Sequence, residues 1–288
     1  MSGDAFKLET VPELQEPLFI AGFDGWGNTL EVATETIAYL VRRLGGEPIG
    51  HISPDAFYRY DESRPNVLIE NGVLEDIALP GGTLYAARME SGEHDLVFLS
   101  ADEPSLAWGA FVDGLFSSLE RLGVQTVITI GSMYDSILPT ERVISGITSS
   151  EELMVVLNDL NVFPVSYSGP GAIHSVIHTR AMEMGIASIS LWCHCPYYLQ
   201  GSPHYGLMEH LCGVLSTIGK FDLDTGDLHE GWQRLNDQIQ ELVENSPEIQ
   251  NMIDDIRKAK VKGSFANMRA GGKDNDKVID IQPFLDPK

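Results

Sequence analysis

Residues 165–199 read VSYSGPGAIHSVIHTRAMEMGIASISLWCHCPYYL, and this stretch decides the fold class that the sequence predicts. A short apolar run is followed by the turn sequence SGPG at 168–171, a helical pattern and a second apolar run. The helical pattern shows in apolar residues spaced by three and four positions: Ile173, Val176, Ile177, Ala181 and Met184. A helix between two such runs is typical of a βαβ crossover, so we expect a parallel sheet.

The second apolar run ends in an unusual cluster, CHCPYY at 193–198. The residues before this cluster, 187–192, suit a buried strand. In open α/β sheets, ligands bind outside the carboxyl ends of the parallel strands. We therefore look for function at the strand ends first, with His194 and Tyr197 among the candidate residues.

The chain opens with another strand–helix–strand pattern. Residues 17–22 form a buried run, a turn follows at 23–28, and a helix then precedes a strand at 47–52. Either Asn28 or Thr29 is suited to cap this helix. The buried side of the helix is predicted to carry Leu30, Ala33, Ile37, Leu40 and Val41.

Similar patterns continue along the chain. The sequence predicts strands at 67–69, 84–87, 96–99 and 124–130, helices at 107–122, from 149–152 on and at 203–218, and a helical hairpin at 229–244 and 247–260. Together these elements predict an α/β fold, a three-layer α/β/α sandwich with a mostly parallel sheet. The expected division is a sandwich domain at 1–222, a helical hairpin extension at 223–262 and a polar tail at 263–288.

The formal net charge of −23 is unevenly distributed along the 288 residues. From residue 257 onward there are eight Lys and Arg against four Asp and Glu, whereas residues 1–256 hold eleven against 38. Such an acidic body excludes nonspecific nucleic-acid binding, which needs clustered cations. No lysine occurs between Lys7 and Lys220, which disfavours chemistry that depends on a lysine amine.

The sequence carries no membrane or secretion signal that we recognise. No apolar stretch is long enough to span a bilayer, and the start, MSGDAFKLETVPEL, lacks the basic and apolar regions of a signal peptide. The three cysteines all lie between Cys193 and Cys212 and make no disulfide framework. We therefore expect a cytoplasmic protein with no membrane partner.

The turn FDGWGN at 23–28 leads from a strand into a helix N-terminus, where free amides favour anions. The dinucleotide-binding spacing is absent, because the glycines around this turn are three and two residues apart. Asp24, Trp26 and Asn28 are ligand candidates on this basis. The sequence nevertheless favours a structural role, in which Asp24 and Asn28 fix the turn and Trp26 packs.

Two further pairs of residues follow predicted strands. Asp102 and Glu103 are able to hold a metal or to exchange a proton. The pattern favours instead that they cap the helix that follows, where negative charge is stabilising. Tyr134 and Asp135 come after the central strand at 124–130 and complete the set of candidates at the strand ends.

Metal and nucleophile patterns are incomplete. His174 and His178 lie four residues apart on the predicted helix, but no Glu follows the first His as in zinc proteases. Cys193 and Cys195 should point to one face of a strand, yet a structural zinc needs four ligands. A Cys nucleophile served by His194 is disfavoured because the chain would have to turn sharply. We therefore expect no metal site.

Six short motifs, in this order, resemble the proteasome assembly chaperone 2 family, some of whose prokaryotic members carry an older label, ATP-grasp superfamily. They are GFDGWGN (22–28), DAFY (55–58) followed by RP (64–65), EP (103–104) followed by Trp108, LPTER (138–142), YSGP (167–170) and LWCHCPYY (191–198). The resemblance covers roughly residues 17–220. The helical hairpin resembles the C-terminal extension of the bacterial branch.

The resemblance implies a sandwich akin to the phosphorylase/hydrolase-like fold, self-association as homotrimers, and protein partners, without a settled activity or cofactor. Where the family often has Pro-His-Thr-Arg, this chain has PTER at 139–142, so no His role carries over. We expect Glu141 and Arg142 to form an internal ion pair or a subunit contact. Archaeal members proposed to engage the proteasome end in a hydrophobic-Tyr-any tail, but this chain ends in FLDPK (284–288), so docking by its tail is not expected.

Three hypotheses follow. The first is an oligomeric chaperone-like or scaffold protein. The second is an enzyme or small-molecule binder at the carboxyl edge of the sheet, as a metal-assisted hydrolase or, less favoured, an ATP-dependent ligase. The third is an interaction module whose helical hairpin holds the partner. The candidates for a ligand pocket are Asp24, Trp26, Asn28, Asp102, Glu103, Tyr134, Asp135, His194 and Tyr197.

Overall fold

The computed structural model describes residues 5–90, 92–200, 203–261 and 279–280. The tail expected from residue 263 onward lies outside the described residues, except for the short strand β13 (Ile279–Asp280), which pairs with β12 (Leu199–Gln200). In the part that the structure describes, no helix combines the length and the apolar character needed to cross a membrane.

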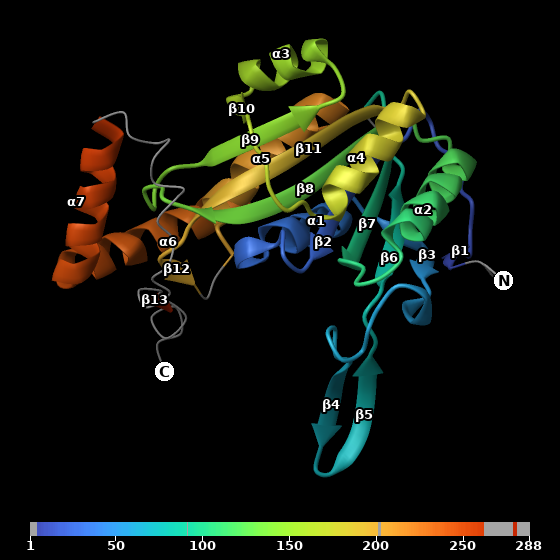
Figure 1. The fold of residues 1–288 in the computed structure, drawn as a ribbon, viewed down its shortest axis with the longest axis horizontal. Coiled ribbons are helices and arrows are strands. Elements are labelled where there is room, and N and C mark those ends of the chain that lie inside the picture. Colours follow the sequence, from blue (N-terminus) through green and yellow to red (C-terminus); the bar gives the residue numbers. More distant parts are fainter. Residues whose placement is uncertain (1–4, 91, 201–202, 262–278, 281–288) are drawn as a thin grey trace.

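A large mixed sheet forms the centre of the molecule (Figure 1). In pairing order its strands are β1 (Phe6–Leu8), β3 (Glu47–Ile52), β6 (Gly82–Ala87), β7 (Leu96–Asp102), β2 (Leu18–Asp24), β8 (Thr126–Asp135), β11 (Ala187–Pro196), β9 (Val143–Thr148) and β10 (Val162–Pro164). The four neighbours β7, β2, β8 and β11 are parallel. Their nearly continuous apolar runs are explained by burial on both faces. The predicted fold, with a mostly parallel sheet, is confirmed.

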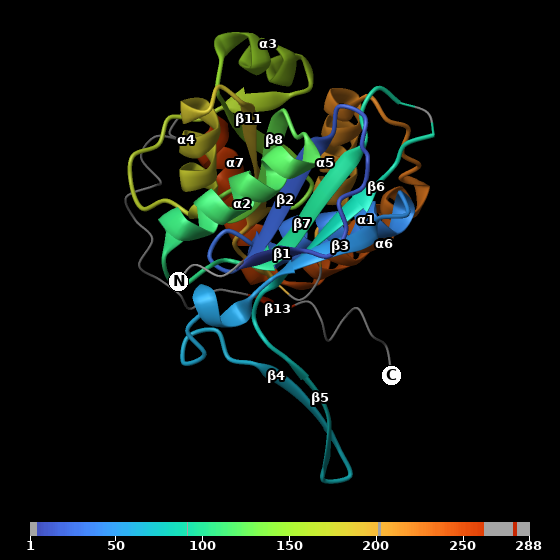
Figure 2. The same ribbon diagram turned by 90° about the vertical axis from the view of Figure 1, so that its right-hand side faces the viewer.

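Helices cover both faces of this sheet (Figure 2). The first face packs against α1 (Val32–Arg43) and α5 (Tyr205–Gly219), and the second against α2 (Trp108–Leu122) and α4 (Ile173–Glu183). On α1, the predicted buried residues Ala33, Ile37 and Leu40 are fully buried, and Leu30 and Val41 pack beside them. The arrangement is therefore the three-layer sandwich that the periodicities indicated.

The crossover predicted within residues 165–199 is wrong in its pairing. The helix and the second strand exist, as α4 and β11, but the preceding strand, β10, ends before Val165. β10 is parallel to β9, and β9 is antiparallel to β11, so β10 and β11 run in opposite directions and are not neighbours. Periodicity identifies a strand but not its partner. The parallel pairing arises because α4 returns the chain to β8, beside which β11 lies.

A two-stranded hairpin extends away from the sheet, and both views show it without another element alongside (Figures 1 and 2). It consists of β4 (Asn66–Glu70) and β5 (Val73–Ala78). The turn residues Asn71 and Gly72 have φ values of 51° and 82°, the left-handed conformation that suits a tight hairpin and that Asn-Gly adopts readily. Only β4 was anticipated from the sequence.

The predicted helices beyond the sandwich are also present. α3 (Glu151–Asp159) begins after Ser150, whose hydroxyl accepts a hydrogen bond from Leu153 as expected for a cap. α6 (Gly226–Asn245) and α7 (Pro247–Val261) form the C-terminal hairpin. A separate apolar cluster joins this hairpin to the end of β11: Tyr198, Leu199, Trp232, Leu235, Ile239, Ile249, Ile253 and Ile256.

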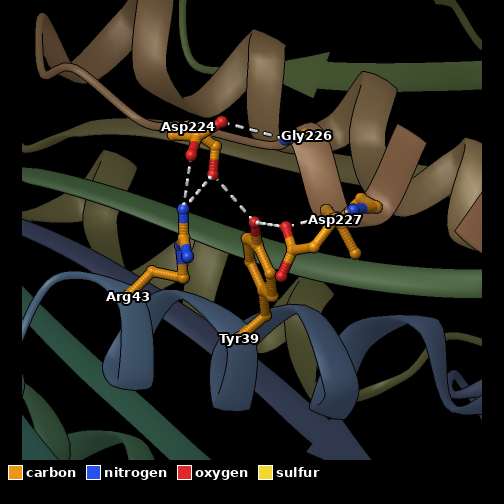
Figure 3. A network of polar contacts seen from close by, with 6 residues as sticks. Tyr39, Arg43, Asp224, Gly226 and Asp227 are labelled. Carbon is orange, nitrogen blue, oxygen red and sulfur yellow. Dashed lines mark hydrogen bonds and ion pairs between the residues drawn. The ribbon is translucent and has the colours of Figure 1, made fainter. Parts of the chain in front are cut away.

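Polar contacts tie the start of α6 to α1 (Figure 3). The Tyr39 hydroxyl donates to the Asp227 carboxylate at 2.6 Å and is 2.9 Å from the Asp224 carbonyl. Arg43 contacts the same carbonyl and also the Asp224 carboxylate, at 2.9 Å. Trp232 of α6 stacks on His204, with ring centroids 5.0 Å apart. The helical hairpin is therefore packed onto the body rather than tethered beside it.

Candidate functional site

The segments that were predicted to share a rim do lie side by side at the carboxyl ends of the parallel strands. Asp24 at the end of β2 pairs in register with Asp102 at the end of β7. Asp135 at the end of β8 pairs with Pro196 at the end of β11. The turn after β2 joins this row, because Asn28 forms a bridge to Ser132. We call this row of strand ends the rim.

The side chains at the rim, however, point to both faces of the sheet. Successive side chains on a strand alternate between the two faces. Asp24 and Asp102 share parity with Ile20 and Phe98, which pack against α1 and α5. Asp135 on β8 and His194 on β11 alternate with the residues of those strands that pack on that face, so they lie on the opposite face, which α2 and α4 cover. The nine predicted residues therefore do not converge on one pocket.

Asn28 locks the turn at 24–28. Its side-chain oxygen accepts hydrogen bonds from the Ala33 and Thr34 amides at the start of α1, at 3.0 and 3.3 Å. Its side-chain nitrogen donates to Asp24 and to the Thr34 hydroxyl, both at 2.9 Å. Asp24 and Asn28 thus have the structural contacts that the sequence favoured. The expected packing of Trp26 is wrong, because this side chain is 65 % exposed.

Asp102 and Glu103 have different partners. Asp102 accepts a hydrogen bond from the Gly81 amide at 2.7 Å, and burial, with a smaller effect from Asp24, raises the pKa of its carboxyl. Glu103 accepts from the Ile173 amide at 2.8 Å, so it caps α4. The expectation that these acids cap the following helix is therefore wrong, since α2 begins after Ala107 with no side-chain cap.

A polar hollow of about 270 Å³ lies beside Asp102. It is lined by Asp24, Thr34, Leu79, Gly81, Gly82, Thr83, Tyr85, Ser100, Ala101 and Asp102. It has room for a few water molecules or a small polar molecule. Its two carboxylates already accept hydrogen bonds from the protein's own groups.

The other face holds a chain of three hydrogen-bonded side chains. His194 Nδ1 lies 2.7 Å from the Asp135 carboxylate, and His194 Nε2 lies 2.9 Å from the Ser145 hydroxyl. With Asp135 accepting the Nδ1 proton, Nε2 is the acceptor for the serine, which is the order of groups in a hydrolase triad. Ser145 is only 4 % exposed. Sequence reasoning missed Ser145, because it reaches His194 only through the pairing of β9 with β11.

The two tyrosines among the candidates belong to other environments. Tyr134 is on the outer surface of β8 and is exposed. Tyr197 packs edge-on against Tyr198, with ring centroids 5.2 Å apart, and lies against the apolar cluster of α6 and α7. Neither side chain is part of the Asp135–His194–Ser145 chain or of the polar hollow.

The cysteines face away from His194. Cys193 and Cys195 do share one face of β11, as predicted, and both pack in the core with Cys212 on the α5 side. Burial raises the pKa of Cys193, and that of Cys212 to about 12, so these thiols stay protonated. His194 points to the opposite face and cannot serve them as a base.

The paired histidines on α4 each have a partner of their own. His174 Nε2 donates to the Ile130 carbonyl at 2.8 Å, and His178 Nδ1 is 2.8 Å from the Ser188 hydroxyl. Within the described ranges, no group of three or more His, Cys, Asp or Glu side chains is placed to hold a metal ion.

Arg142 pairs with a residue other than its neighbour. Its guanidinium contacts Glu209 of α5 at 2.8 Å and lies over the ring of Trp232. Glu141 accepts a hydrogen bond from the Leu138 amide at 2.8 Å. The PTER motif thus fastens the loop before β9 to α5 and α6, and the internal ion pair forms with Glu209 rather than within the motif.

The comparison with protein-family models identifies the fold family. The model of the PAC2 family matches residues 19–243. The chain belongs to the PAC2 family. A search of curated proteins found no match. The ATP-grasp label that some members carry is not supported by the family match or by the similar structures.

Solved structures of PAC2-like proteins superpose well on this chain. A PAC2 family protein from Streptomyces avermitilis is 25 % identical with a TM-score of 0.73, covering 82 % of this chain and 99 % of its own. A proteasome-assembly chaperone homologue from Mycobacterium tuberculosis is 23 % identical with a TM-score of 0.75 and the same coverage. An archaeal proteasome activator from Pyrococcus furiosus, PbaB, is 16 % identical with a TM-score of 0.65, covering 82 % of this chain and 97 % of its own.

The stability of this PAC2 protein should fall as the pH is lowered from about 6.5 toward 4, and His174 should contribute to the fall. Burial lowers the pKa of His174 from 6.5 to about 4, and its Nδ1 has no hydrogen-bond partner. The unfolded chain therefore binds a proton in this window that the folded chain does not. A shift of this size corresponds to a loss on the order of 3 kcal/mol below pH 4.

Urea unfolding of His174→Phe between pH 7.5 and 4.5 checks this. The variant should show a shallower dependence of the unfolding free energy on pH than the wild type, although it is less stable at neutral pH because the Ile130 carbonyl loses its donor. His51→Gln, at a position where the side chain is 44 % exposed, should keep the wild-type dependence. Parallel pH profiles for His174→Phe and the wild type would contradict the assignment.

Proposed function

We propose that this PAC2 protein is a chaperone-like assembly factor or scaffold that works as a homo-oligomer, with a trimer the expected form, and that binds the subunits of a larger protein assembly. The family match over residues 19–243 carries this proposal. The similar structures include a protein described as a proteasome-assembly chaperone homologue and one described as a proteasome activator. We therefore take proteasome subunits as the first partners to test.

The geometry of the rim supports a binding role over a catalytic one. In enzymes with open α/β sheets the rim holds the ligand. Here Asn28, Asp24, Asp102 and Glu103 are engaged with backbone amides of the protein itself. Large apolar side chains are instead exposed on the outer surface, as at protein interaction sites. A cytoplasmic location is part of the proposal, because three buried, unpaired cysteines suit a reducing compartment.

The contacts of the helical hairpin do not favour the hypothesis that it is a separate module that holds the partner. α6 is held by Tyr39, Arg142 and His204, and its apolar side covers Tyr198. An interaction module that could be removed without harm would lack such contacts. We therefore assign the hairpin to the folded body, and place partner binding on the oligomer as a whole.

The assembly role is tested with unassembled proteasome α and β subunits from the organism that encodes this protein. The subunits are mixed with and without it, and assembled particles are followed by native gel and by peptide hydrolysis. We expect faster or more complete assembly and a complex with one subunit type by sedimentation. An unrelated acidic protein of similar size controls for net charge. Unchanged assembly together with no complex would contradict the proposal.

A hydrolytic activity is the second candidate, and the Asp135–His194–Ser145 chain is the observation that favours it. In such a reaction the Ser145 oxygen would attack an acyl carbon while His194 takes its proton, and His194 would then pass this proton to the amine or alcohol that leaves as its bond to the acyl carbon breaks. The burial of Ser145 opposes this role, because a substrate cannot reach the hydroxyl in this conformation.

A fluorophosphonate probe separates the two candidates. It forms a covalent adduct with an activated, accessible serine, so we expect no stoichiometric labelling of the folded protein by mass spectrometry. Ser145→Ala serves as the matched variant. Labelling that maps to Ser145 and disappears in Ser145→Ala would establish a reactive serine and would contradict the assignment of this chain to a structural role.

A further inference from the structure

The β4–β5 hairpin forms an arm on which every residue is exposed (Figure 1). We call residues 66–79, NVLIENGVLEDIAL, the arm. Its large apolar side chains are between 47 and 60 % exposed: Val67, Leu68, Ile69, Val73, Leu74, Ile77 and Leu79. The arm also carries three carboxylates, Glu70, Glu75 and Asp76, and no Lys, Arg or His. Exposed apolar side chains at this density are typical of a surface that another molecule covers.

Apolar side chains lie on both faces of the arm. In an antiparallel pair, residues opposite one another share a face. The register gives the first face two apolar pairs, Val67 with Ile77 and Ile69 with Leu74, and the second face two mixed pairs, Leu68 with Asp76 and Glu70 with Val73. Glu75 is the extra residue at the irregularity between these pairs. A contact that covers one face alone therefore leaves apolar side chains of the other face in water.

The base of the arm is fixed to the rim. Pro65 precedes the arm and the buried Pro80 follows it, and a proline restricts its own backbone and that of the residue before it. The Gly81 amide donates to the Asp102 carboxylate, and the Asp102 amide donates to the Gly81 carbonyl, both at 2.7 Å. The Tyr58 hydroxyl lies 3.3 Å from the same carbonyl. A base held in this way lowers the entropy cost of ordering the arm when a partner binds.

We propose that the arm inserts into a groove of a partner protein, and that this groove has apolar walls and basic residues at the positions that meet the carboxylates of the arm. This inference rests on the proposed function, because it names the surface through which this PAC2 protein binds a subunit of the larger assembly. The arm is not the contact between copies of this chain, so each copy in the oligomer presents an arm of its own to the partner.

The dimensions of the arm favour a groove over a flat partner surface. Two strands of about six residues form a ribbon of about 20 by 10 Å, and their side chains make it about 10 Å thick. One face offers only ~200 Å², whereas each partner in a stable interface buries about 800 Å². Two faces, two edges and the tip together offer ~900 Å². A partner has to enclose the arm to reach the area of a stable interface.

The charge of the arm determines the chemistry of the groove. Insertion removes water from Glu70, Glu75 and Asp76, and a buried carboxylate without a partner is strongly destabilising. The arm has no cation to pair with them, so the groove has to supply lysine or arginine. An enclosing groove meets Glu75 as well as the two carboxylates of the paired positions. Complementary charge also speeds the encounter of the two proteins.

The same three carboxylates argue against other occupants. A second copy of this chain would meet the arm with an acidic surface, since residues 1–256 carry eleven basic against 38 acidic residues. Nucleic acids and anionic membrane surfaces repel carboxylates. A basic protein groove with apolar walls is complementary to both kinds of side chain on the arm.

Three sets of substitutions test the inference by surface plasmon resonance with unassembled proteasome α and β subunits. The first set removes the charge of the arm: Glu70→Gln, Glu75→Gln and Asp76→Asn. The second removes apolar contacts but keeps strand propensity: Ile69→Thr and Leu74→Thr. The matched control removes three exposed carboxylates from helices elsewhere: Glu35→Gln, Glu120→Gln and Glu241→Gln. We expect each arm set to weaken the wild-type complex at least about tenfold, and the control to stay within about twofold.

Folding and self-association are measured on the same samples. All three sets should keep the near-ultraviolet circular dichroism, the cooperative melt and the sedimentation coefficient of the wild type. The complex should also weaken as salt is added, and the first set should show a shallower salt dependence than the control, because it lacks the paired charges. Equal salt dependence in these two sets would contradict the basic groove.

The outcomes separate this inference from the proposed function. Arm variants that bind as tightly as the wild type would overturn the role of the arm and leave the proposed function standing. A wild type that binds neither subunit would overturn both. Loss of self-association in the second set would show that a second copy covers the arm, and would contradict the inference. Binding of the wild type to vesicles of phosphatidylcholine and phosphatidylserine that the second set abolishes would contradict it as well.

Discussion

The side chain of Asn28 is the contact on which the rest of the rim depends. Its oxygen accepts hydrogen bonds from the Ala33 and Thr34 amides at the start of α1, at 3.0 and 3.3 Å. Its nitrogen donates to the Asp24 carboxylate at the end of β2, at 2.9 Å. The same turn is joined to β8, because the Ser132 amide donates to the Gly27 carbonyl at 2.7 Å. There is little room for a side chain at Gly27, because a Cβ there would lie 3.3 Å from both His174 and Trp192. One turn thus connects two strands and two helices.

This closure has a consequence for function. In an open α/β sheet the turns after the parallel strands normally spread apart and leave a crevice. In this PAC2 protein they interlock, and Glu103 reaches across to cap α4. Asp24 and Asp102, which were ligand candidates, accept hydrogen bonds from the protein's own amides. The β4–β5 hairpin projects away from the rim, and all residues of its two strands are exposed (Figure 1).

Much of the fold was predictable because it depends on local patterns. The spacing of Ala33, Ile37 and Leu40 identified α1 and its buried side, and the apolar run after Val124 identified the central strand β8. Alternation along β11 correctly placed both cysteines on one face. The sequence of residues 23–28 also indicated that Asp24 and Asn28 fix a turn.

The errors concern contacts between residues far apart in the chain. Glu103 caps a helix that starts 70 residues later, and Ser145 reaches His194 only across paired strands. The direction of β10 relative to β11 depends on β9 between them. Local propensity carries no information on such pairings. The split of the rim residues between two faces follows from alternation, but only once the strands that carry them are known to be neighbours.

Amide hydrogen exchange tests the closed rim most directly. The amides of Ala33, Thr34, Ser132 and Ile173 all donate to groups of the rim. If the turns interlock as described, these amides should exchange only through global unfolding, as slowly as those in the centre of β8. Exchange of these amides as fast as that of residues 66–78 in the exposed hairpin would show that the rim opens, and would contradict the account.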